Sequence, residues 1–117
     1  MKYHRYHIGC VVVEKGKIIS SGFNSTKTHP IQKTYNIERF TSDATPHTLH
    51  AEISALSHVI NKDVNWDNVE LYIYREFRNG NVALAKPCKS CMKLIKELGI
   101  KKIHYTTYDG YCTEILK

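Results

Sequence analysis

Two short stretches organise this chain: Leu49-His50-Ala51-Glu52-Ile53 and Pro87-Cys88-Lys89-Ser90-Cys91. His50, Cys88 and Cys91 can together hold a zinc ion (Zn2+) through one nitrogen and two sulfur atoms. Three protein ligands leave the fourth tetrahedral position open for water, as in catalytic zinc sites, whereas a structural site closes with four. The two stretches therefore predict a zinc centre that does chemistry, with these three residues as its ligands.

Glu52 stands two residues after His50 and is the candidate that moves protons to and from this water. Bound zinc lowers the pKa of water from ~15.7 to about 7, so hydroxide becomes available at neutral pH. A carboxylate within reach of the water can accept its proton and pass it to a substrate. We expect Glu52 to be the catalytic residue and not a zinc ligand.

The spacing of these residues suits the starts of two helices. Cys88 and Cys91 are three apart, so one turn of a helix opened by Pro87 brings both sulfur atoms to one face. Free N–H groups at a helix start favour thiolates over thiols. Because His50 and Glu52 fall at the start of another predicted helix, two helix N-termini are expected to converge on one ion.

The rest of the pattern predicts an α/β domain. Runs rich in strand-forming residues predict strands over residues 8–13, 18–23, 69–74 and 100–106. Apolar residues at helical spacing predict helices from the start signals Pro46 and Thr48 through Ile60, and from Pro87 to a C-cap at Gly99. The order β-β-α-β-α-β places the second helix between two parallel strands. We therefore predict a single α/β domain over residues 1–117.

Two connecting segments are expected to lie near the site. Residues 24–48 are polar and long for a loop, and such loops are often functional. Residues 75–86 contain the hairpin-turn pair Asn79-Gly80. They predict a β-ribbon that returns toward the site through Val82, Ala83 and Leu84.

The composition describes an ordinary globular protein, with 42% hydrophobic and 24% charged residues. No run approaches the roughly 20 apolar residues of a membrane span, and the N-terminus does not resemble a secretory signal. Four cysteines in this spacing do not form a secreted disulfide framework, so a cytoplasmic location is expected. The net charge of +6 suits an anionic ligand but does not choose between a nucleotide and a nucleic acid.

Other readings of the cysteines leave part of the pattern unexplained. A redox Cys-x-x-Cys pair gives no role to His50 and Glu52. A four-cysteine structural zinc site would need Cys10 and Cys112, which stand without a partnering motif. Cys10 is expected to be a buried apolar residue.

The sequence resembles the cytidine/deoxycytidylate deaminase superfamily over nearly its whole length. The resemblance rests on these segments: residues 9–13, Gly22-Phe23-Asn24, His50-Ala51-Glu52, Pro87-Cys88-Lys89-Ser90-Cys91, and the strand up to Tyr108-Asp109. The order His-x-Glu followed by Pro-Cys-x-x-Cys is the signature of zinc deaminases that act on nucleobases. The family implies a three-layer α/β/α sandwich with a central mixed sheet, and hydrolytic loss of an exocyclic amine as ammonia.

The resemblance also implies substrate contacts. Asn24 would hydrogen-bond the sugar or base, the backbone of Ala51 would hold the polar edge of a pyrimidine, and Tyr108 would wall the pocket. Lys27 and His29 follow Asn24 in the long loop, where a basic residue can meet a phosphate.

The chain departs from the family in ways that affect its expected assembly. Family members usually have a helix before the first strand, whereas seven residues precede Ile8 here. One sheet face is therefore expected to be poorly covered, and a homo-oligomer is the natural remedy. Little room is expected after Tyr108 for a fifth strand.

Three functions from different classes follow. The first is a zinc hydrolase that deaminates a free cytosine nucleotide or nucleoside, with dCMP as the first substrate to test. The second is a deaminase that edits tRNA or single-stranded DNA, although the chain has no dense basic tail or evident array of stacking aromatics. The third is a non-catalytic, zinc-stabilised binding module, which would have no use for Glu52.

Overall fold

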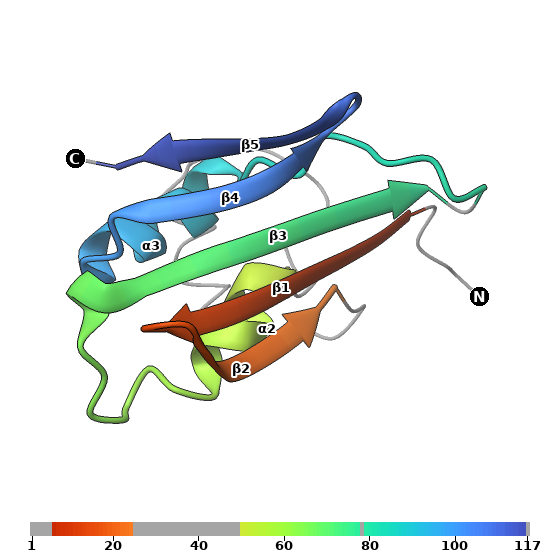
Figure 1. Ribbon diagram of the computed structural model, residues 1–117. Helices are drawn as coiled ribbons and strands as arrows, with labels where there is room; N and C mark the ends of the chain where they lie inside the picture. Colours follow the sequence, from red (N-terminus) through yellow and green to blue (C-terminus); the bar gives the residue numbers. More distant parts are fainter. Residues whose placement is uncertain (1–5, 25–49, 78, 117) are drawn as a thin grey trace.

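The computed structural model describes residues 6–24, 50–77 and 79–116, which form a five-stranded sheet and two α-helices. The strands lie in the order β2-β1-β3-β4-β5 (Figure 1). Their bounds are β1 Tyr6–Glu14, β2 Lys17–Phe23, β3 Val69–Phe77, β4 Lys102–Thr107 and β5 Gly110–Ile115. All four predicted strands are present, and the sheet is mixed because only β3 and β4 run parallel.

β1 and β2 pair antiparallel and form a hairpin. Its two turn residues, Lys15 and Gly16, have φ angles of 50° and 81°. Positive φ at both positions matches the twist of the flanking strands and permits a tight turn. The hairpin places β1 in the interior of the sheet, where β1 pairs antiparallel with β3.

The second helix, α3 (Lys89–Leu98), connects the parallel strands β3 and β4, as predicted. It begins two residues after Pro87, with Cys88 as its N-cap. Gly99 ends it with a left-handed φ of 97°, and the Gly99 N–H donates to the carbonyl of Lys96 at 3.1 Å. The predicted C-cap is confirmed.

The first described helix, α2 (Ala51–Ser57), is shorter than predicted and is followed by the 3-10 turn η1 (Trp66–Asn68). The prediction that the helix reaches Ile60 is wrong. The Ser57 hydroxyl donates to the Ser54 carbonyl at 2.8 Å, and the Val59 N–H donates to the Leu56 carbonyl at 3.0 Å. Because these bonds span three residues or fewer, they end the α-helical ladder. The start signals Pro46 and Thr48 lie outside the described residues.

β5 corrects the expectation that little room remains for a fifth strand. Six residues suffice, and each pairs antiparallel with β4. Tyr108 and Asp109 form the turn between the two strands, and Gly110, the first residue of β5, has a φ of 156°. The Asp-Gly pair followed by alternating strand formers was a signal for this hairpin.

Residues 75–77 and 79–86 form the predicted ribbon. Glu76 and Val82 make an antiparallel bridge, and the Phe77 N–H donates to the Asn81 carbonyl at 2.9 Å. The returning segment buries Ala83 and Ala85, whereas Leu84 is exposed.

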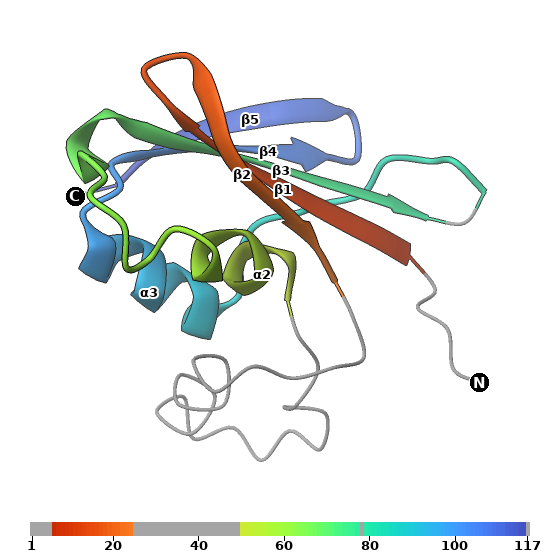
Figure 2. The same ribbon diagram turned by 90° about the horizontal axis from the view of Figure 1, so that it is seen from below.

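Both helices lie against the same face of the sheet (Figure 2). Large apolar side chains from three strands and both helices form one core between them: Val12, Leu71, Ile103, Ile53, Leu56 and Ile95. The α/β class and the central mixed sheet are confirmed. Within the described residues the layers number two, and no helix covers the other face. No described helix is long and apolar enough to cross a membrane.

Candidate active site

The start of α2 places His50 and Glu52. His50 is the N-cap, with extended backbone angles (φ −85°, ψ 153°), and its carbonyl accepts the Ser54 N–H at 2.9 Å. Glu52 lies in the first turn with only 5% of its surface exposed. A carboxyl group that is buried at a helix start beside a candidate metal ligand is a functional candidate.

The start of α3 places the two cysteines. Cys88 is the N-cap, and its carbonyl accepts the Met92 N–H at 2.8 Å. Cys91 lies one turn further on and is fully buried. Both sulfur atoms therefore face the same space, as the Cys-x-x-Cys spacing predicts.

The three predicted ligands come together. His50 Nδ1 lies 3.3 Å from Cys91 Sγ and 3.5 Å from Cys88 Sγ, and the three ligand atoms lie within 4.8 Å of one another. Zinc bonds of about 2.3 Å to sulfur and about 2.0 Å to nitrogen make a tetrahedral nitrogen–sulfur edge of about 3.5 Å. The donor set and its spacing fit zinc, with one position left for a ligand outside this cluster.

The two thiols are not equivalent. Hydrogen bonds from Cys91 and from His50 lower the pKa of Cys88 to about 3, although burial opposes them. The hydrogen bond to Cys88, together with burial, raises the pKa of Cys91 well above its usual value. The two thiols thus differ in how readily they lose a proton, and a metal ion would bind both as thiolates.

The Glu52 carboxyl has a pKa raised above its usual value. Burial is the largest cause, and the negative charge of Cys88 adds to it. Hydrogen bonds from its own backbone N–H and from Cys91, and the charge of His50, act in the opposite direction. A carboxyl with a raised pKa exchanges protons more readily near neutral pH.

A close approach of backbones holds α2 against the sheet. A Cβ added at Gly22 would lie 2.5 Å from the Ala55 nitrogen and 2.6 Å from Ser54 Oγ. The Ser20 hydroxyl also donates to the Ala55 carbonyl at 2.6 Å. Gly22 thus has no room for a side chain, and this contact fixes the helix that carries His50 and Glu52.

Thr106 on β4 anchors the segment that leads to Cys88. Its hydroxyl accepts the Arg75 N–H at 3.0 Å and donates to the Ala83 carbonyl at 2.7 Å. Its carbonyl accepts the Ala85 N–H at 2.9 Å. Thr106 therefore ties the ribbon to the ends of β3 and β4, just before the first cysteine. The sequence did not single it out, because a threonine in a strand carries no motif.

The expected substrate contacts are only partly brought together. Asn24 joins the ends of β1 and β2. Its side-chain Oδ1 accepts the Ile8 backbone N–H at 3.2 Å, and its own backbone N–H donates to the Ile8 carbonyl at 3.1 Å. Ala51 is fully buried at the first position of α2, next to His50. Lys27 and His29 lie outside the described residues.

Tyr108 lies in the β4–β5 turn and is 66% exposed, so it is not a core aromatic. It lines an open hollow of about 550 Å³ together with ribbon and turn residues, among them Phe77 and Val82. No residue of the metal cluster is part of that lining.

The four cysteines do not gather into one site. Cys10 is fully buried on β1, where burial and the nearby Glu52 raise its pKa well above the usual value. Cys112 lies on β5, and its thiol donates to the Thr113 carbonyl at 3.8 Å. Among the residues that the structure describes, the metal-binding cluster contains only His50, Cys88 and Cys91.

Three solved structures have a similar fold. Two are of dCMP deaminase from the cyanophage S-TIM5, one in apo form and one in complex with dCMP and dUMP. Each is 27% identical over 86% of this chain, with TM-scores of 0.57 and 0.54, and the present chain spans 65% of their length. Cytidine deaminase from Burkholderia pseudomallei is 13% identical over 98% of this chain and 79% of its own, with a TM-score of 0.63, which shows a shared fold alone.

No curated protein sequence matches the chain significantly. The family model for the cytidine and deoxycytidylate deaminase zinc-binding region matches residues 1–107, which include the three predicted ligands and Glu52. The chain therefore belongs to the cytidine and deoxycytidylate deaminase family.

Proposed function

We propose that this protein removes the exocyclic amine of a free cytosine nucleotide by hydrolysis, with dCMP converted to dUMP and ammonia. One observation carries the proposal: the buried Glu52 lies beside three side chains, His50, Cys88 and Cys91, that are close enough to hold a metal ion. The similar cyanophage enzyme, which has been captured with dCMP and dUMP, supports this choice of substrate.

Zinc held by His50, Cys88 and Cys91 would activate a water molecule by lowering its pKa. Glu52 would accept a proton from the water molecule whose oxygen adds to C4 of the cytosine ring. Glu52 would deliver that proton to the ring nitrogen N3. It would then move the proton of the new C4 hydroxyl to the amine, which leaves as ammonia. Water and the aminated ring thus become a carbonyl and ammonia, and Glu52 ends in the state in which it began.

We propose substrate contacts for five further residues. The bonds between Asn24 and Ile8 orient the Asn24 side chain, and its amide nitrogen would donate to the sugar or base. The backbone of Ala51 would hold the polar edge of the pyrimidine next to His50. Tyr108 would form the outer wall of the substrate pocket, and Lys27 or His29 would contact a phosphate of the nucleotide. A reducing compartment such as the cytoplasm would keep both zinc-binding thiols available.

The test is a deamination screen with zinc-quantified protein. The panel contains dCMP, CMP, deoxycytidine, cytidine, cytosine, guanine, adenosine and a single-stranded oligonucleotide. Glu52→Gln serves as the blank, and Asp63→Asn, which alters an exposed carboxyl group, serves as the matched control.

Turnover of dCMP by the parent and by Asp63→Asn, but not by Glu52→Gln, is the expected result. Turnover of the oligonucleotide alone would replace the proposal with an editing deaminase, to which the net charge of +6 is suited. Full zinc content with no turnover of any compound would favour a binding module.

A further inference from the structure

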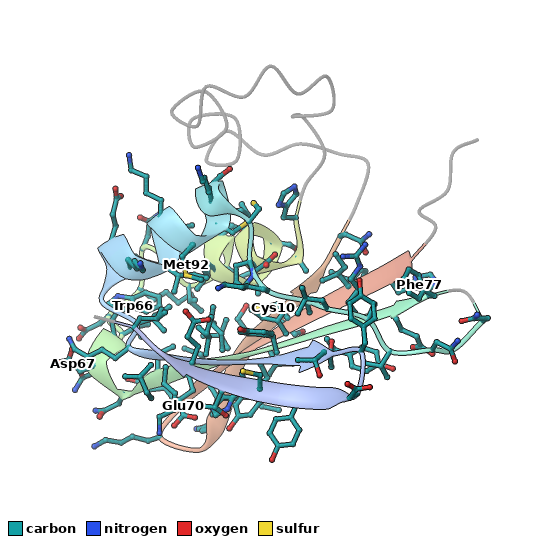
Figure 3. The ribbon with its side chains drawn as sticks, turned by 90° about the horizontal axis from the view of Figure 1, so that it is seen from above. Cys10, Trp66, Asp67, Glu70, Phe77 and Met92 are labelled. Carbon is teal, nitrogen blue, oxygen red and sulfur yellow. The ribbon has the colours of Figure 1, made fainter. Side chains whose placement is uncertain are left out.

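The sheet face opposite the helices collects exposed apolar side chains. Of the eight large hydrophobic residues that are most exposed in the described part of the chain, six lie on this face: Ile18, Phe23, Tyr72, Tyr74, Tyr111 and Ile115. Their placement follows from strand alternation, since Tyr72 and Tyr74 alternate with the buried Leu71 and Ile73. Figure 3 shows the division, with Met92 on the helix side and Glu70 on the opposite side.

The centre of this open face is held in one arrangement. The rings of Tyr72 and His104 stack with centroids 4.3 Å apart and planes 13° apart. His104 Nε2 lies 2.5 Å from Glu70 Oε1, and His104 Nδ1 lies 2.8 Å from Thr113 Oγ1. A surface whose side chains are already ordered loses less conformational entropy when a partner binds.

The charges of the open face nearly balance. Glu70 and Lys102 are neighbours across β3 and β4, and Glu76 accepts the Tyr74 hydroxyl at 3.0 Å. Two copies of a chain with a net charge of +6 can therefore approach through this face without the repulsion that their other surfaces would impose. Carboxylates beside Tyr72 and Tyr74 would repel the phosphates of a nucleic acid, so the aromatics are poorly suited to stacking bases.

The exposed apolar area matches what a dimer needs. The six side chains are between 44% and 76% exposed, which gives about 700 Å² if each exposes about 150–250 Å² when fully accessible. The largest apolar patch on a typical monomer is about 300–600 Å², whereas a stable interface buries about 800 Å² on each partner.

We propose that the open face binds a second copy of this chain, so that two sheets pack face to face around a two-fold axis. Such packing joins the same patch on both copies and places the sheets about 10 Å apart. The metal cluster lies on the helix side of each sheet and stays accessible. This interface does not depend on the proposed deaminase activity.

Sedimentation velocity of the zinc-loaded protein over a wide concentration range tests the interface. The parent chain should show a monomer–dimer equilibrium. Phe23→Lys and Tyr111→Lys should each weaken the dimer by at least about a hundredfold, because each would bury an unpaired charge in the interface. Leu84→Lys is the matched control, since Leu84 is an exposed apolar residue outside the strands, and it should dimerise like the parent.

A monomer at every concentration, or a dimer that both face variants leave intact, would overturn the proposal. Hydroxyl-radical footprinting of the parent chain gives a second measurement that needs no variant. Tyr111 should become protected as the concentration rises, while Tyr108, which is 66% exposed in a turn, stays reactive. Protection of Tyr111 by an added single-stranded oligonucleotide, and not by concentration, would replace the second copy with a nucleic acid.

Discussion

Glutamate carboxyl groups on the two sides of the sheet have pKa values that are shifted in opposite directions. On the helix-covered face, burial raises the pKa of Glu52. On the open face, the hydrogen bond from His104 lowers the pKa of Glu70. Desolvation favours the neutral form of a carboxyl, whereas hydrogen bonds to the charged form favour the carboxylate. The proposed proton transfer therefore lies on the covered face, and the proposed interface lies on the open face.

The largest expected effect concerns the metal on the covered face. Cys88→Ser should weaken zinc binding by more than about a hundredfold, the upper range for residues that only support a ligand. It should also lower the melting temperature, because metal binding is coupled to folding. Zinc analysis and thermal denaturation measure both effects. Cys112→Ser, which changes a cysteine outside the cluster, should keep its zinc, and equal zinc in both variants would remove Cys88 from the ligand set.

The second prediction compares glycines on the two faces. Gly22→Ala should destabilise the fold by about 1–3 kcal/mol, because the new Cβ meets the backbone of α2. Gly9→Ala is the matched control, since its Cβ would find its nearest neighbour, the Gly22 carbonyl oxygen, 3.9 Å away. Urea denaturation measures both variants. Equal losses would contradict the close contact between α2 and β2.

The third prediction compares threonines. Thr106→Val should cost about 1–2 kcal/mol, because it leaves the Arg75 N–H and the Ala83 carbonyl without their hydroxyl partner. It should also weaken zinc binding, though less than Cys88→Ser does. Thr113→Val, on the exposed strand β5, should leave zinc affinity unchanged. Calorimetric zinc titration distinguishes the two, and identical affinities would show that Thr106 does not position Cys88.

The smallest effect belongs to the open face and depends on pH. A lowered pKa means that the Glu70 carboxylate stabilises the folded state above its usual pKa, and that this contribution is lost as the pH falls through the lowered value. The melting temperature of the parent should therefore exceed that of Glu70→Gln near neutral pH, and the gap should close in acid. A gap that widens as the pH falls would contradict the sign.

Much of this arrangement could be predicted from the sequence, because strong local patterns carry it. The strands, the parallel connection through α3 and the three zinc ligands follow from alternation, the Gly99 cap and the spacing of His50, Cys88 and Cys91. The length of α2 could not be predicted from the sequence, because apolar residues continue at helical spacing as far as Ile60. The helix nevertheless ends at the Ser57 hydrogen bond to Ser54. β5 was missed even though Asp109-Gly110 predicts a hairpin.

Tertiary contacts had no sequence signal of their own. The approach of Gly22 to α2 and the hydrogen bonds of Thr106 arise only when distant segments meet. Within the described residues both helices lie on one face of the sheet (Figure 2). The residues on the open face could be identified only from the strand register.

The most direct test of the central claim measures zinc content and dCMP turnover together in Glu52→Gln. If the buried carboxyl transfers protons and does not bind the metal, the variant should keep the parent's zinc. Its kcat should fall by about a hundredfold to ten-thousandfold, the usual contribution of a positioned acid–base group. Near-normal turnover would contradict the assignment of Glu52, and loss of zinc would show that the carboxyl belongs to the metal site itself.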